Sequence, residues 1–422
     1  MPLLGASRWF LTAALAHLSL AGLLLLFAGA SGILGADWNA LVWLLLVGFV
    51  VATTQGFSWQ LFPTVARRSV SSGGVAYLSW AALEGAVAFG LLGIYEAPAG
   101  GALGPIFSLA AALLAISLSL TTIRFWQARF EPALRTSGPM PRPGDRETVP
   151  LFLIAWTAAL GSAFFFLLAG LSEGPGFGWW LAAVHLFVLG HALVLILAVS
   201  LRLVPRSLDA DPPAKVVVAL AGLATAGGFL VPVGMLLVSP SASIALDVLA
   251  APEAAFALLF LATLLFLGVR ARTARPPLAL HLSGVLALLI GGGLGLGMVA
   301  THDYAPVVTH ALVNVLGFVG LTILVMWFGM VAPFQRISHA WTGKMLWGLS
   351  SAWLAAVVFL AWAGGRPGPS LAWAATLGGG LLFGVAIAWG IGTVPVLFSQ
   401  LNPLPGLSVE RIRVLRNRWD RP

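Results

Sequence analysis

A series of long apolar segments fills nearly the whole of this chain and limits what it can fold into. A helix needs ~20 mostly apolar residues to cross the ~30 Å hydrocarbon core of a bilayer. Twelve segments reach that length, at about residues 10–34, 38–61, 75–97, 103–127, 150–171, 177–203, 215–239, 244–269, 279–300, 306–332, 344–364 and 371–397. We therefore predict an all-α, multi-pass membrane protein that forms a single transmembrane domain over residues 1–422.

The composition supports helices that lie in lipid. Hydrophobic residues make up 59% of the chain and charged residues 9%, and the mean hydropathy is +0.99. Backbone groups in lipid must be paired internally, which leaves helices or closed barrels. Barrel strands are short and alternate in polarity, unlike these continuous segments. The chain has no cysteine, which excludes disulfides, thiolate-bound zinc and cysteine-ligated iron–sulfur clusters.

The basic residues are sorted to one side of the predicted membrane. If the amino terminus is inside, 21 of the 22 lysines and arginines fall on the inner face, and only Arg366 falls outside. Positive residues favour the cytoplasmic side, so we predict the cytoplasmic (inner) membrane of a cell with both termini inside. The same distribution argues against nucleic acid as a partner, despite a pI of about 11.1.

One pattern occurs three times along the chain, in residues 38–69, 179–207 and 305–338. Each copy has an aliphatic–glycine–ring triplet centred on Gly48, Gly190 or Gly317, and a proline follows 15, 15 and 16 residues later. Repeats of fixed period indicate repeated architecture. The preceding segments contain Ala16-His17-Leu18-Ser19 in the first case and Leu280-His281-Leu282-Ser283 in the third.

We therefore predict three pseudo-repeated units of four helices, at about residues 1–140, 150–276 and 277–400. Residues 128–149 are rich in proline, glycine and mixed charge, which is typical of a solvated linker. The basic tail at 402–422 is predicted to be cytoplasmic. Glycine runs at 291–297 and 378–384 indicate close helix packing rather than a nucleotide loop, because they lie inside apolar segments.

Polar residues inside the predicted spans are the first candidates for function. Glu84 is read as the only carboxylate near the centre of a span, and a buried acid in lipid is costly unless it is paired or protonated. A proton relay and a neutral acid bonded to a neighbouring helix both remain open for Glu84. Gln55 and Gln60 are polar residues of the second span.

The histidines are the candidates for metal or cofactor binding. His17 lies about a third of the way into the first predicted span, and both a ligand or relay role and a structural role remain open. His310 and His185 both lie ~6–9 Å below the outer ends of their helices, and His191 is ~9 Å deeper. A simple hydrogen bond within the membrane remains the alternative to a metal-ligand role for His310 and His185.

Two criteria disagree about which histidine pairs with His310. Depth favours His185. Rotation about the helix axis, counted from the repeat glycines, favours His191, because His185 is turned ~160° from His310 and His191 only ~80°. Asn314 lies one turn below His310 on the same face and could orient a ligand.

The predicted layout resembles subunit I of the haem–copper oxidases, which has twelve helices in three four-helix units with both ends inside. Residues 305–338 resemble that family's tenth helix, where a His-x-His motif precedes a glycine and a proline. They are also similar to the first spans of the NnrS-type haem- and copper-containing membrane proteins. The resemblance implies roles for His310 on the haem-ligand region and for His185 or His191 near the copper ligand.

The chain departs from this family in its histidines. Subunit I has histidines on helices 2, 6 and 7 and two on helix 10. Here the second span has Trp43, Gln55 and Gln60 instead, the seventh has no histidine, and Val308 and Leu312 flank His310. A binuclear centre is therefore not expected. The resemblance implies at most one haem b or a copper ion, with His310 and His185 as metal ligands and His191 and His17 as further cofactor contacts.

Three functions follow as hypotheses. The first is an oxidase-like membrane protein with a reduced metal site, which binds a haem or a small respiratory ligand such as nitric oxide and contacts other respiratory subunits. The second is a transporter or channel that uses Glu84, Gln55, Gln60, Asn314 and the histidines. The third is a structural or assembly subunit without a site. The sequence leaves open whether the protein is an enzyme.

Overall fold

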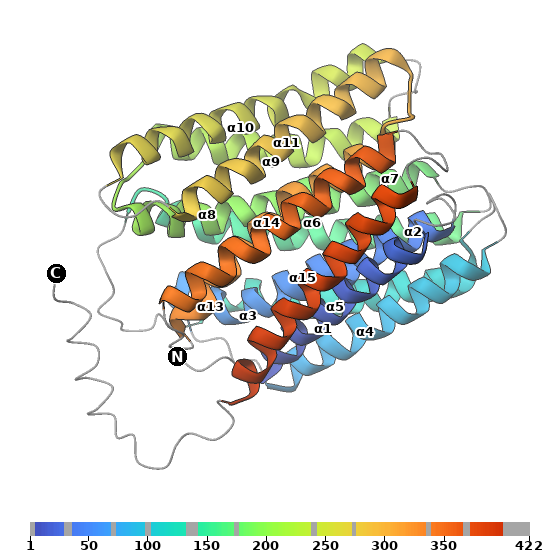
Figure 1. The fold of residues 1–422 in the computed structure, drawn as a ribbon, viewed down its shortest axis with the longest axis horizontal. Helices are drawn as coiled ribbons and strands as arrows, with labels where there is room; N and C mark the ends of the chain where they lie inside the picture. The colour runs from blue at the N-terminus through green and yellow to red at the C-terminus, as the bar shows by residue number, and fades with distance from the viewer. Residues whose placement is uncertain are drawn as a thin grey trace.

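Long helices run side by side in the computed structural model of the chain (Figure 1). The structure describes residues 5–28, 36–68, 73–97, 103–131, 142–172, 177–237, 243–271, 276–334, 339–365 and 372–399. Within these ranges, twelve helical segments are long and apolar enough to cross a membrane, as predicted. The basic tail at 402–422 lies outside the described residues.

Nine of the twelve described segments are single α-helices. They are α1 (Gly5–Ala28), α4 (Gly73–Glu96), α5 (Gly104–Ala128), α6 (Asp145–Leu171), α9 (Ala214–Leu237), α10 (Ser243–Arg270), α11 (Pro276–Thr301), α14 (His339–Gly365) and α15 (Ala372–Ser399). The other three, which we call the central spans, each contain a π-helical segment. They are α2 (Ala36–Trp43), η1 (Leu44–Val51) and α3 (Ala52–Ala66); α7 (Phe177–His185), η2 (Leu186–Leu193) and α8 (Val194–Leu208); and α12 (Val307–Leu312), η3 (Val313–Gly320) and α13 (Leu321–Phe334).

The central spans form the inside of the bundle. In their apolar stretches, 100%, 83% and 94% of the residues are buried, against 28–56% in the nine outer helices. The three π segments also contact one another pairwise. Side chains on these spans are therefore surrounded by protein, which is where polar groups within a membrane can be accommodated.

Each π segment has eight residues with glycine in the fifth place, namely Gly48, Gly190 and Gly317. The flanking residues keep right-handed helical backbone angles, so each central span continues through its π segment without a break. The i→i+5 hydrogen bonds of a π-helix change the rotation per residue, and such segments are frequent at functional sites.

The first two central spans end in the same way. Arg67 and Asp209 adopt left-handed backbone angles (φ 51° and 47°), and the N–H of each donates to the carbonyl four residues earlier, at Pro63 and Pro205. This left-handed cap satisfies a carbonyl that the helix leaves unpaired.

Apart from α11 and α14, each described outer helix packs against the next outer helix along the chain, and the last packs against the first. Helix α15 packs along α1, as the neighbouring red and blue ribbons in Figure 1 show. An added Cβ on Gly22 would lie 2.7 Å from the backbone nitrogen of Phe383, and one on Gly379 would lie 2.5 Å from that of Leu26. The predicted close packing at the glycine run of α15 is therefore present at Gly379.

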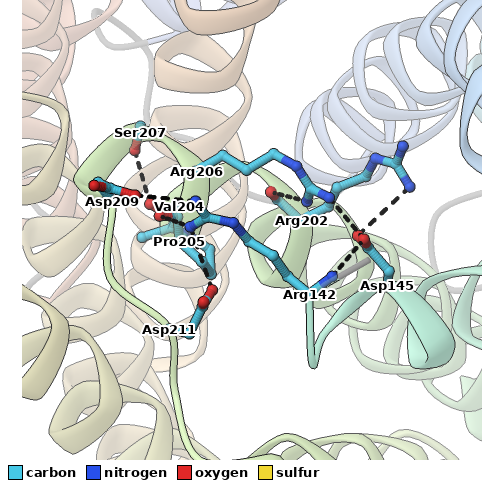
Figure 2. Close-up of polar contacts among 9 residues, drawn as sticks. All are labelled: Arg142, Asp145, Arg202, Val204, Pro205, Arg206, Ser207, Asp209 and Asp211. Carbon is cyan, nitrogen blue, oxygen red and sulfur yellow. Dashed lines mark hydrogen bonds and ion pairs between the residues drawn. The ribbon is translucent and has the colours of Figure 1, made fainter. Parts of the chain in front are cut away.

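A network of ion pairs joins the start of α6 to the end of α8 (Figure 2). The Arg142 guanidinium lies 3.0 Å from Asp209 and 3.3 Å from Asp211, and it donates to the Pro205 carbonyl at 2.8 Å. Asp145 accepts from Arg206 at 2.7 Å. These groups lie at the predicted inner helix ends. They hold the end of α8, in the sixth span, against the start of α6, in the fifth span, and against Arg142 just before it.

Candidate functional site

The rings of His185 and His310 lie near each other, one on each of two central spans. Their ring centroids are 6.1 Å apart and their ring planes are 23° from parallel. Of the two criteria, depth predicted the partner correctly and rotation did not. His191 lies six residues further along the same span, a rise of ~9 Å that a side-chain rotation does not offset. The rotation count also assumed α-helical geometry through residues that are π-helical.

Hydrogen bonds to backbone carbonyls fix how both rings of this pair are protonated. His185 Nδ1 lies 2.8 Å from the carbonyl of Leu181, and His310 Nδ1 lies 2.7 Å from the carbonyl of Gly291. A carbonyl oxygen only accepts, so each Nδ1 carries the hydrogen, and in the neutral ring each Nε2 carries a free lone pair. Both side chains are half-buried. The described residues offer neither Nε2 a hydrogen-bonding partner.

The glycine run of α11 makes room for His310 and Asn314. An added Cβ on Gly295 would lie 2.8 Å from His310 Cε1, and one on Gly291 would overlap the Asn314 amide. By contrast, nothing lies within 4 Å of such an atom on Gly293. The Asn314 Nδ2 donates to the His310 carbonyl at 3.0 Å, which orients the amide beside the imidazole as predicted. Its Oδ1 is buried and has no partner among the described residues.

The distance between the paired rings is compatible with one metal ion bound by a nitrogen of each. Metal–imidazole bonds of ~2.0–2.1 Å place two ligand nitrogens ~4 Å apart, which is compatible with centroids separated by 6.1 Å. A haem would also need a slot for its macrocycle between the rings. Neither histidine lines a groove of about 490 Å³ over α1, α14 and α15 or a cavity of about 40 Å³ between α3, α6, α8 and α13. Neither of these two hollows is therefore such a slot.

Other clusters do not extend the pair into a larger metal site. Among the described residues, no group of three or more histidine, aspartate or glutamate side chains could hold a metal ion. An ion at His185 and His310 would therefore take its other ligands from Asn314, water or a small molecule.

His191 is bonded to protein on both sides of its ring. Its Nδ1 donates to the Ala155 carbonyl at 3.0 Å, and its Nε2 lies 3.1 Å from the Thr54 hydroxyl. The side chain is fully buried, and Trp156 packs against it with ring centroids 4.7 Å apart. His191 thus connects the second, fifth and sixth spans and is not brought to His310.

His17 and Glu84 form a separate pair on another side of the bundle. His17 Nδ1 lies 3.0 Å from the Gly48 carbonyl and Nε2 lies 3.2 Å from Glu84 Oε2. Because α1 begins at Gly5, His17 lies at the middle of its helix, so its predicted place a third of the way into the span was wrong. This contact between neighbouring helices is compatible with both readings of Glu84, the proton relay and the neutral acid.

Gln55 belongs to a buried polar cluster of the second, third and fourth spans. Its Nε2 lies 3.3 Å from Ser79 Oγ, 3.1 Å from Ser117 Oγ and 3.1 Å from Thr121 Oγ1. All four side chains are fully buried. Gln60 is also buried. The mutual hydrogen bonds of the Gln55 cluster explain how these polar residues are tolerated in an apolar bundle.

Glu253 was missed in the sequence, where Glu84 was read as the only central carboxylate. Glu253 is the eleventh of the 28 residues of α10, well inside the helix. Both of its carboxyl oxygens are buried and have no partner among the described residues. Gly227 of α9 faces it, since an added Cβ there would lie 2.7 Å from Glu253 Oε2. Two features of the sequence could have identified this residue: a glutamate within an apolar segment and a glycine in the preceding segment.

Comparison with known proteins does not assign the chain to a family. No protein-family model matches the chain, and no curated protein matches it in sequence.

Proposed function

We propose that this membrane protein binds one transition-metal ion between His185 and His310, and that the ion binds a small ligand. The observation that carries the proposal is the paired imidazoles, each with Nδ1 bonded to a carbonyl and Nε2 left free. Histidines that bind metals almost always donate their other N–H to a carbonyl, a carboxylate or water, which orients the ring.

Copper is the ion that we favour. Imidazole ligands suit copper, zinc, iron and nickel, and divalent copper has the highest affinity of these for a given nitrogen site. Two side-chain ligands leave coordination positions open, and a small molecule such as nitric oxide can occupy an open position. Asn314, held beside His310, is the neighbouring group that would orient this ligand.

The proposed scaffold consists of three four-helix units, at about residues 1–140, 150–276 and 277–400, in the layout of subunit I of the haem–copper oxidases. Three observations support it: the three π segments, their glycines in the same place, and their pairwise contacts. In each proposed unit the glycine meets the preceding outer helix, at His17, Ala158 or Ala287. We therefore propose that Ala287, in place of His281, corresponds to His17 in this scaffold.

Metal titration of the purified, full-length protein tests this function. We expect the wild-type protein to bind one copper ion per chain with no haem absorption, and His185→Ala and His310→Ala each to lose that ion. His281→Ala is the matched control, because it removes an intramembrane histidine outside the pair. Copper binding that survives in both pair variants would contradict the proposal, and a haem absorption band lost in His310→Ala would restore haem as the cofactor.

A further inference from the structure

We propose that His17 and Glu84 form a proton-binding site at mid-membrane depth, which holds one proton between an imidazole and a carboxyl group. His17 is the thirteenth of the 24 residues of α1, and Glu84 is the twelfth of the 24 residues of α4. The distance between His17 Nε2 and Glu84 Oε2 is 3.2 Å. This inference is independent of the metal proposed at His185 and His310.

The Gly48 carbonyl determines which nitrogen of His17 exchanges a proton. It lies 3.0 Å from Nδ1 and can only accept, so Nδ1 keeps its hydrogen and Nε2 faces Glu84. If Nε2 has no hydrogen, Glu84 must be the protonated acid that donates to it. If Nε2 has one, a carboxylate accepts it. The pair therefore shares one proton and has no net charge in either form, which suits an apolar environment.

The π segment η1 contributes the third part of this site. Gly48 has no side chain, and an added Cβ would lie 2.8 Å from His17 Cβ and 2.9 Å from its Cγ. The imidazole can therefore approach the backbone of a central span closely enough to bond its carbonyl.

The pair connects the surface of the bundle with its interior. The Glu84 side chain is 30% exposed and that of His17 is 8% exposed. Ala81, Ala88 and Phe89 of α4 are exposed near Glu84. The second carboxyl oxygen, Oε1, is buried and has no partner among the described residues. A proton that moves from Glu84 to His17 would pass from α4 to α1, where the imidazole is bonded to the Gly48 carbonyl of a central span.

Other charged or titratable groups near these elements lie toward helix ends. On α1, α4 and the described elements packed against them, they are Arg8, Asp37, Arg67, Tyr77, Tyr95, Glu96 and Arg124. Helix α15 has none within its bounds. His17 and Glu84 are therefore the two titratable groups of this set at mid-helix.

Labelling with the apolar reagent dicyclohexylcarbodiimide tests the site in full-length protein in lipid nanodiscs. A protonated carboxyl group gives its proton to one carbodiimide nitrogen, and its oxygen adds to the central carbon. Migration of the acyl group to nitrogen then yields a stable N-acylurea with no leaving group. Mass spectrometry of the Glu84 peptide across a pH series measures the protonated fraction.

We expect Glu84 to be labelled in wild-type protein, with labelling that declines as the pH rises. In His17→Gln no imidazole can take up the shared proton, so the proton should stay on Glu84 and more of it should be labelled. At the pH of half-maximal wild-type labelling, this variant should carry nearly twofold more label. Gly48→Ala keeps both titratable groups but displaces the ring, and it should shift labelling in the same direction.

Two control variants make this result specific. Glu84→Gln should remove the label from this peptide, and Glu253→Gln should leave labelling at Glu84 unchanged. A variant is compared only if its helical content and its size-exclusion profile match those of the wild-type protein. Equal pH profiles in wild type, His17→Gln and Gly48→Ala would overturn the proposal, as would the absence of label at Glu84 in all three.

Discussion

Gly295 lies against the imidazole of His310, where an added Cβ would be 2.8 Å from the ring atom Cε1. The substitution Gly295→Ala should therefore move the ring away from His185. Changes in the groups that position metal ligands typically cost 10–100-fold in affinity, and we expect copper affinity to fall by about that factor. Competitive copper titration measures it. Gly293→Ala is the matched control, because nothing lies within 4 Å of its added Cβ; equal losses in both variants would refute the explanation.

His191 should matter for stability and not for the metal. His191→Leu removes its buried hydrogen bonds to the Ala155 carbonyl and the Thr54 hydroxyl. We expect the free energy of unfolding to fall by about 1–3 kcal/mol, with one copper ion per chain still bound. Denaturant unfolding in detergent and metal analysis check the two parts. Loss of copper without loss of stability would assign His191 to the metal site instead.

The buried cluster around Gln55 should stabilise the packing of the second, third and fourth spans. Gln55→Ala leaves the hydroxyl groups of Ser79, Ser117 and Thr121 without the amide. The cost should be about 1–3 kcal/mol of unfolding free energy. Gln127→Ala removes an exposed glutamine of α5 and should change stability little. Similar unfolding curves for the two variants would show that the cluster is energetically unimportant.

Contact between the first and last spans depends on the absence of a side chain at Gly379. Gly379→Leu would place a Cβ 2.5 Å from the backbone nitrogen of Leu26, so that α15 must move away from α1. Overpacking of this kind costs about 1–3 kcal/mol, and the thermal unfolding midpoint should fall. Gly384→Leu, at a site with nothing within 4 Å, is the control. An unchanged midpoint for Gly379→Leu would argue against the close packing.

The number and type of the spans could be predicted from the sequence because lipid requires long, internally bonded helices. The repeat glycines each lie inside a π segment, but glycine spacing and hydropathy carry no information about the hydrogen-bond register of a helix. The π-helical geometry of residues 44–51, 186–193 and 313–320 was therefore not foreseen.

The depth of the paired histidines along their helices could be estimated from the sequence. The side chains that each histidine contacts could not. His185 and His310 could be matched by height. The pairing of His17 with Glu84 brings together the first and third spans, and the bonds of His191 reach Ala155 and Thr54 on two others. Such partners depend on which outer helix packs against which central span. Because the twelve apolar segments have similar composition, their neighbours in the bundle cannot be deduced from the sequence.

Electron paramagnetic resonance of Cu(II)-loaded protein tests the metal site most directly, because hyperfine coupling counts the imidazole nitrogens bound to the ion. We predict two histidine nitrogens in the wild-type protein, one in His185→Ala and one in His310→Ala if residual copper remains, and two in His281→Ala. A wild-type spectrum without histidine nitrogen, or one that is unchanged in both pair variants, would contradict a metal site between His185 and His310.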